Sequence, residues 1–169
     1  MNSRSATRMF PYVAFVGSVA FGLVHVYWLL GGGIGLPGGE SMYSSPMVPT
    51  GESSTLLIVI DIIAIPISAL AALLALSLDD SGPWDGLSRR TRLTAAWSIT
   101  ALCTLHAAPT IPDWVALALG NRVVADLTVA EQFLTFVYEP VFLAGAVTFG
   151  LAALHKQKDP DRATVGSLS

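Results

Sequence analysis

Long apolar runs constrain the fold of this chain more than any motif does. Four such runs occupy residues 10–30, 55–78, 93–108 and 132–154. Apolar stretches of about 18 residues or more are typical of transmembrane helices. A chain with 53% hydrophobic and 12% charged residues is also far more apolar than soluble domains are. The sequence therefore predicts an all-α, polytopic membrane protein, with residues 1–169 forming one domain built as a four-helix transmembrane bundle.

The placement of the basic residues predicts the orientation of this bundle. One side collects eight of the nine Lys and Arg residues, namely Arg4, Arg8, Arg89, Arg90, Arg92, Lys156, Lys158 and Arg162, and the other side has Arg122. Loops rich in Lys and Arg stay in the cytoplasm. We therefore expect a multi-pass protein of the cell membrane with cytoplasmic termini, an outer lid at 31–54 and a polar tail at 156–169. Basic residues this sparse give no signal for nucleic-acid binding.

The single cysteine limits the thiol chemistry that this chain can perform. Cys103 is the single cysteine of the chain and lies within the third apolar run. A lone cysteine forms no intramolecular disulfide, no CxxC redox pair and no thiolate metal cluster. The sequence thus argues against a thiol-dependent redox enzyme.

Each apolar run carries one ionisable residue toward its outer end. These residues are His25, Asp61, His106 and Glu139. The rise of 1.5 Å per helical residue places all of them roughly 3 to 10 Å below the outer boundary. An ionisable group inside a membrane costs at least ~2.5 kcal/mol and by default faces the protein interior. We therefore expect the four side chains to converge in one layer, in a pocket that opens outward above an apolar inner half.

Such a layer suits acid/base chemistry on an apolar substrate. A carboxyl group in apolar surroundings can stay protonated at neutral pH and act as a general acid, while a neighbouring histidine or carboxylate acts as the base. This pair of groups can protonate an epoxide or alkene and then remove a proton from the resulting cation. Aromatic faces stabilise passing positive charge.

The sequence accordingly predicts a membrane-embedded terpene cyclase or isomerase with a terpenoid or lipid substrate. Its predicted catalytic residues are Glu139, Asp61, His25 and His106. Its predicted substrate-binding residues are Tyr27, Trp28, Phe136, Tyr138 and Phe142. Neither a metal nor a cofactor is required by this chemistry.

Other interpretations of the same residues remain open. The polar layer can simply fix the packing of helices in a non-enzymatic accessory or lipid-binding subunit. His25 and His106 can also be axial ligands of one haem iron, as in four-helix membrane cytochromes. Zinc bound by the two histidines and two carboxylates is chemically allowed, although no HExxH spacing is present. The oligomeric state does not follow from the sequence.

Two blocks of the sequence resemble a known family. The block H-x-Y-W-x-x-G-G runs from His25 to Gly32, and the block Tyr138-Glu139-Pro140 precedes the last apolar helix. Together they resemble a bacterial family of small four-helix integral membrane proteins of unknown function. In that family Tyr-Ser-Pro is common at the second block, and an apolar residue stands at the position of Asp61. The resemblance implies the fold, and it implies that the two carboxyl groups serve a function particular to this branch.

Overall fold

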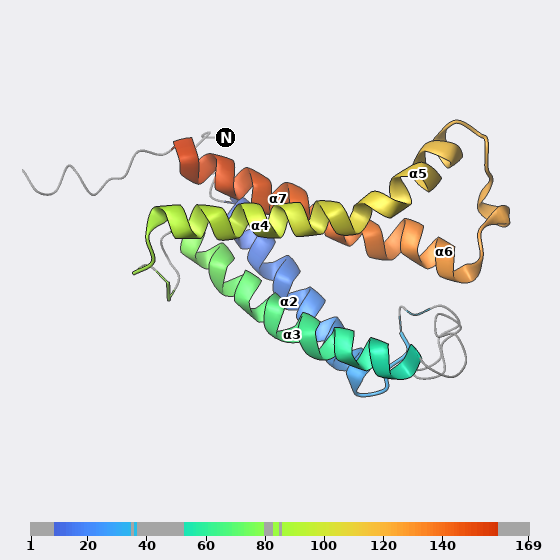
Figure 1. Ribbon diagram of the computed structural model, residues 1–169, viewed down its shortest axis with the longest axis horizontal. Coiled ribbons are helices and arrows are strands. Elements are labelled where there is room, and N and C mark those ends of the chain that lie inside the picture. Colours follow the sequence, from blue (N-terminus) through green and yellow to red (C-terminus); the bar gives the residue numbers. More distant parts are fainter. Residues whose placement is uncertain (1–8, 35, 37–52, 80–82, 85, 159–169) are drawn as a thin grey trace, which may run out of the picture.

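The computed structural model describes residues 9–34, 36, 53–79, 83–84 and 86–158, and every regular element within these ranges is helical (Figure 1). The elements in order are α2 (Met9–Leu29), α3 (Ser53–Leu78), α4 (Arg89–Ala107), η1 (Ala108–Thr110), α5 (Ile111–Ala118), η2 (Val124–Asp126), α6 (Val129–Phe133), the π-helical turn η3 (Leu134–Tyr138) and α7 (Glu139–Lys158). The all-α prediction is confirmed. Most of the lid expected at 31–54, most of the tail at 156–169, and Arg4, Arg8 and Arg162 lie outside the described residues.

Local capping explains why two helices begin earlier than predicted. Helix α4 begins at Arg89 rather than at residue 93 because the Ser88 hydroxyl accepts a hydrogen bond from Thr91 N at 3.1 Å. Helix α6 begins after Thr128, whose hydroxyl accepts from Glu131 N while the Glu131 carboxylate accepts from Thr128 N at 2.7 Å. This reciprocal capping box satisfies two backbone N–H groups that have no partner within the helix.

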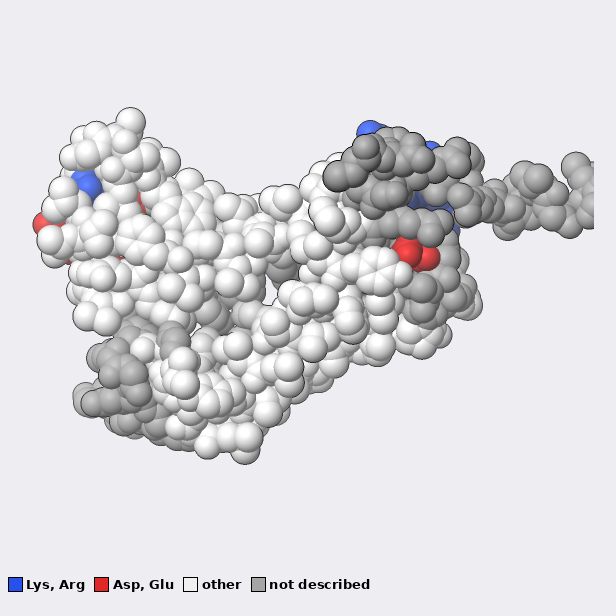
Figure 2. Space-filling view, turned by 180° about the vertical axis from the view of Figure 1, so that it is seen from behind, with Lys and Arg blue, Asp and Glu red and all other residues white. Residues whose placement is uncertain are grey.

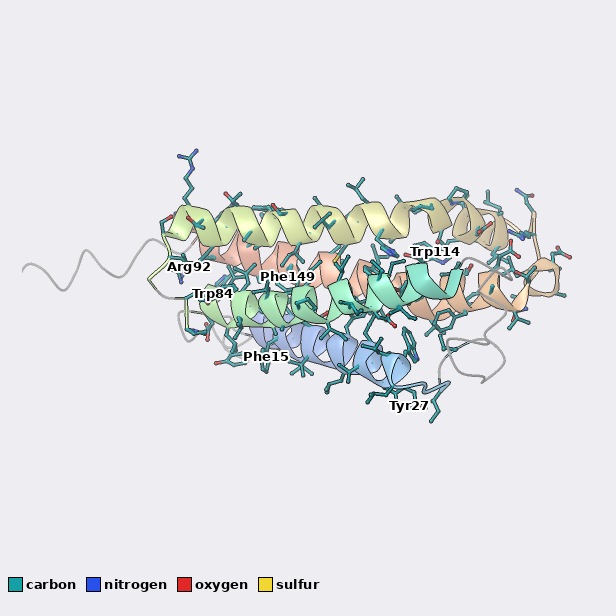
Figure 3. All side chains as sticks on the ribbon, turned by 60° about the horizontal axis from the view of Figure 1, so that its bottom comes forward. Phe15, Tyr27, Trp84, Arg92, Trp114 and Phe149 are labelled. Atoms are coloured by element: carbon teal, nitrogen blue, oxygen red, sulfur yellow. The ribbon has the colours of Figure 1, made fainter. Side chains whose placement is uncertain are left out.

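Three helical segments are long and apolar enough to cross a membrane, and these are Met9–Leu29, Ile58–Leu78 and Val129–Lys158. Three of the four predicted apolar helices thus have the length and hydropathy that a membrane crossing requires. Helix α4 is long enough, but its first turn contains Arg89, Arg90 and Arg92, which lower its mean hydropathy. Even so, α4 lies alongside α7 in two views of the molecule (Figures 1 and 3).

The long helices form two pairs, with α2 packed on α3 and α4 packed on α7. Small residues allow both pairs to approach closely. A Cβ added at Gly22 on α2 would lie 3.1 Å from Ser68 Cβ on α3, and one added at Gly150 on α7 would lie 3.4 Å from Thr100 Cγ2 on α4. Figure 1 shows the two pairs meeting at one end and diverging toward the other.

The apolar core fills the end where the pairs meet. Its buried residues are Ala14, Ala71, Leu74, Ala75, Leu78, Ala96, Phe149, Ala152 and Ala153. Figure 3 places Phe15, Trp84, Arg92 and Phe149 toward this end, while Tyr27 and Trp114 lie toward the diverging end. The buried Arg92 donates from Nη1 to Ser77 O at 2.6 Å and so ties α4 to the last turn of α3. The predicted apolar half of the bundle is thus present.

Charged side chains gather at the two ends of the molecule. On the face drawn in Figure 2, coloured Lys, Arg, Asp and Glu atoms appear only near these ends, with an uncoloured stretch between them. At the diverging end, Arg122 donates from Nη1 to Asp113 Oδ1 at 2.6 Å and from Nη2 to Glu131 Oε1 at 2.9 Å. The hydrogen bond to Glu131 is the main cause that raises the pKa of Arg122. These ion pairs join α5 to α6.

Candidate functional site

His25 on α2 and Asp61 on α3 form a fully buried pair in which each residue is only 1% exposed. His25 Nδ1 lies 2.8 Å from Phe21 O. A carbonyl oxygen only accepts hydrogen bonds, so Nδ1 carries the hydrogen and Nε2 faces the carboxyl group. The distance from Nε2 to Asp61 Oδ1 is 3.8 Å, which is too long for a hydrogen bond. Asp61 Oδ2 makes no hydrogen bond within the described chain.

His106 on α4 and Glu139 on α7 form a second and closer pair. His106 Nδ1 lies 3.0 Å from Glu139 Oε2, within hydrogen-bonding distance. The Glu139 side chain is 7% exposed, whereas that of His106 is 43% exposed. The Phe142 ring stacks on the imidazole with centroids 3.7 Å apart and planes within 4°. The second pair therefore has a buried acid and a histidine that reaches the protein surface.

Five aromatic side chains connect the two pairs, and we call them the aromatic cluster. They are Phe21, Trp28, Phe133, Tyr138 and Phe142. Phe21 lies 4.1 Å from the His25 ring and 5.2 Å from the Phe142 ring, measured between centroids. Phe142 in turn contacts both Tyr138 and His106. A continuous path of ring contacts thus leads from one histidine to the other, across the space between the two helix pairs.

The π-helical turn η3 sets the position of Glu139. Within this turn Glu139 N donates to Leu134 O, and the next residue is Pro140, which has no N–H to continue the pattern to Thr135 O. Trp114 on α5 supplies the missing donor, since its Nε1 lies 2.8 Å from Thr135 O. Turns of this kind occur frequently at functional sites. One indole N–H therefore stabilises the irregular backbone that precedes the buried acid.

The H-x-Y-W-x-x-G-G block forms the C-terminal end of α2. Gly31 adopts a φ of +90°, a conformation that glycine accommodates without strain. The Tyr27 hydroxyl accepts from Ile34 N at 3.2 Å, and Trp28 Nε1 donates to Ile34 O at 3.1 Å. A Cβ on Gly32 would lie only 2.2 Å from the Tyr27 ring. Both aromatic residues of the block thus hold the turn that follows the helix.

The predicted site residues separate into two groups. The four predicted catalytic residues occur as two pairs that are linked by the aromatic cluster. Of the predicted substrate-binding residues, Trp28, Tyr138 and Phe142 belong to that cluster. Tyr27 instead packs on the turn after α2, and Phe136 is 51% exposed with no ring contact to the cluster. Binding of substrate by any of the five residues stays a prediction.

Sequence reasoning missed Phe21, Phe133 and Trp114. The first two are ordinary residues of apolar helices, although Phe21 precedes His25 by four positions and so shares its helix face. Trp114 lies outside the four predicted helices, and its bond to Thr135 O depends on how α5 folds back. Its only sequence signal was Pro140, which leaves a carbonyl without a donor.

The arrangement of the four residues as two separate pairs can be compared with the zinc and haem interpretations. Among the described residues, no three His, Cys, Asp or Glu side chains come together, so the four predicted residues are not gathered as zinc ligands would be. The rings of Phe21 and Phe142 lie between the two imidazoles. Neither a zinc site made from all four residues nor a bis-histidine haem site is favoured by this geometry.

The fold and the site together define an all-helical protein suited to a membrane, with two histidine–carboxyl pairs at one end of its helices. The chain belongs to the family described as "Protein of unknown function (DUF3995)", whose sequence model matches residues 18–149. The matched region contains both pairs and the whole aromatic cluster. No curated protein and no solved structure matches the chain.

Proposed function

We propose that this protein is a membrane-embedded enzyme that uses the two histidine–carboxyl pairs as acid and base groups on an apolar substrate. The observation that carries the proposal is the path of aromatic rings between the pairs. Acid/base catalysis on a terpenoid needs a proton donor, a proton acceptor and an environment that tolerates a cation. All three are close together at the diverging end of the bundle.

The proposed reaction is a proton-initiated cyclisation or isomerisation. Glu139 or Asp61 donates a proton to an alkene carbon or an epoxide oxygen, and a carbocation forms on the substrate. The negative faces of the aromatic cluster stabilise this cation. His25 or the remaining carboxylate then removes a proton from carbon and forms an alkene. Product and substrate have the same composition, and proton exchange between the groups restores the acid.

Two buried polar atoms, one in the His25–Asp61 pair and one in the turn before Glu139, support a polar group on the substrate. Asp61 Oδ2 and Thr135 Oγ1 are buried without a hydrogen-bond partner among the described residues. Leaving such an atom unpaired costs about 1–3 kcal/mol. An epoxide or hydroxyl oxygen on an otherwise apolar substrate would offset part of that cost. We therefore favour an oxygenated terpenoid over a plain hydrocarbon.

The proposal includes a topology with four crossings and both termini in the cytoplasm. Ala14 near the start of α2 and Ala152 near the end of α7 belong to the same core, so the chain enters and leaves the bundle at one end. An even number of crossings is required for that arrangement. Helix α4 would be the fourth crossing, with its three arginines at the cytoplasmic boundary.

The proposal is tested by incubating the purified protein in lipid nanodiscs with plain and epoxidised polyprenyl compounds. The expected result is an isomer of unchanged mass that does not form with the Glu139→Gln variant. In D2O, protonation of an alkene carbon adds one non-exchangeable deuterium, while protonation of an epoxide adds none at carbon. If neither the plain nor the epoxidised compounds give an isomer, the proposal is wrong.

A second function is favoured by one specific observation. Each pair joins adjacent helices, α2 to α3 and α4 to α7, and the aromatic rings pack in direct contact between them. The same arrangement would stabilise an accessory or lipid-binding subunit without catalysis. In that case Glu139→Gln lowers stability and removes no activity.

A further inference from the structure

A surface groove of about 770 Å³ lies at the opposite end of the molecule from the histidine–carboxyl pairs. We call it the basic groove. Its lining residues are Arg89, Arg90, Leu93, Thr94, Trp97, Ser98, Ala101 and Gln157. All but the last belong to α4, and Gln157 is near the end of α7. The groove contains two arginines and no acidic residue, so it suits an anion.

The two arginines have different surroundings. Arg89 donates from Nη2 to Lys156 O at 2.9 Å and to Gln157 O at 2.8 Å, so its guanidinium caps the C-terminal end of α7. Arg90 is exposed, and no hydrogen bond or ion pair to another described residue is recorded for it. Its guanidinium therefore has all of its donors available for a ligand at the mouth of the groove.

The groove changes from charged to apolar along α4. Arg90 stands at the start of the helix, Thr94 follows one turn later, and Ala101 lies eleven residues beyond Arg90. At 1.5 Å per residue this stretch is ~16 Å long, close to the ~15 Å depth of the hydrocarbon layer of one leaflet. Trp97 lies between them and is 36% exposed.

We propose that the basic groove binds an anionic glycerophospholipid. Arg90 binds the phosphate, Gln157 and Thr94 offer further hydrogen bonds to the headgroup, and one acyl chain follows Leu93, Trp97 and Ala101 toward the bilayer centre. Charge complementarity selects this occupant, since basic pockets between membrane helices bind acidic headgroups. The groove is separate from the histidine–carboxyl pairs, so this inference does not depend on the proposed enzymatic function. It rests on the proposed crossing of the membrane by α4.

Tryptophan fluorescence gives a direct test. The full-length protein is reconstituted in phosphatidylcholine vesicles that contain a small fraction of phosphatidylglycerol with brominated acyl chains, which quench nearby indoles. The Trp97 contribution is the difference between wild type and Trp97→Phe. We expect brominated phosphatidylglycerol to quench this contribution several times more strongly than brominated phosphatidylcholine at the same fraction. Arg90→Gln should reduce that preference roughly tenfold, because it removes the charge-assisted hydrogen bonds to the phosphate.

Lys158→Gln is the matched control. It removes one positive charge from the same end of the molecule, at a residue outside the groove. Its preference for phosphatidylglycerol should stay close to that of wild type. The proposal is overturned if both brominated lipids quench Trp97 equally, or if the two charge variants lose the preference to the same extent. It is also overturned if cross-linking through the groove yields a dimer that excludes both lipids, because a second copy of the chain is then the occupant.

Discussion

His106 Nδ1 lies 3.0 Å from Glu139 Oε2, and this contact joins the end of α4 to the first turn of α7. Replacing His106 by alanine leaves the buried carboxyl group without its partner. Because the imidazole is 43% exposed, water can replace part of the lost contact, and we expect a loss of only about 1–2 kcal/mol in stability. Thermal unfolding in detergent measures this loss. His155→Ala, on the same helix pair but at the other end, should leave the melting temperature unchanged.

The hydrogen bond from Trp114 to the Thr135 carbonyl leads to a prediction about substitutions at Trp114 and Pro140. Trp114→Phe removes the indole N–H and leaves the Thr135 carbonyl unpaired, which should cost about 1–3 kcal/mol. Pro140→Ala restores a backbone N–H that can pair with the same carbonyl. The double variant should therefore lose less stability than the sum of the single variants, and a double-mutant cycle measures the difference. Strict additivity would contradict this account of the π-helical turn.

Gly32 and Gly17 make a matched pair of glycine-to-alanine changes. A Cβ on Gly32 overlaps the Tyr27 ring at 2.2 Å, whereas a Cβ on Gly17 meets nothing within 4 Å. Gly32→Ala should displace Tyr27 from Ile34 N and lower the melting temperature by several degrees, since about 1 kcal/mol shifts the melting temperature of a domain of this size by ~2–4 °C or more. Gly17→Ala should be neutral or slightly stabilising, because alanine is the better helix former. Equal effects would show that the turn after α2 is not held by this contact.

The four-crossing topology predicts opposite labelling of two loops. With Cys103 replaced by serine, single cysteines are introduced at Ser88, before α4, and at Asn121, after α5. A membrane-impermeant maleimide should label Asn121→Cys in intact cells, and it should label Ser88→Cys only after the membrane is opened. Labelling of both positions from the same side would show that α4 does not cross.

The sequence was sufficient to predict the helices and the depth of the polar groups along them, but not which polar groups form pairs. Helical rise alone placed His25, Asp61, His106 and Glu139 toward one end. Which histidine meets which carboxyl depends on the helix neighbours, and these follow from the small-residue contacts at Gly22 and Gly150. Periodicity gives the face of a helix and not the identity of the helix packed against it.

Two further features were beyond sequence reasoning for physical reasons. The prediction that α4 begins at residue 93 gave too little weight to Ser88, whose cap draws the three arginines into the first turn of the helix. The aromatic cluster combines residues of α2 with residues of the segment around η3. One of the latter, Phe133, lies before the π-helical turn. A π-helical turn shifts the helix face by part of a turn, so regular periodicity does not predict which rings face inward.

The most direct test of the central claim is the turnover of an oxygenated polyprenyl substrate by wild type, Glu139→Gln and Asp61→Asn at equal amounts of folded protein. These changes keep the size and most of the hydrogen bonding of each side chain and remove its titratable proton. General acid/base groups contribute roughly 10²- to 10⁴-fold to rate, so we expect at least one variant to lose turnover on that scale while its melting temperature stays near that of wild type. Turnover that persists in both variants would contradict the acid/base account.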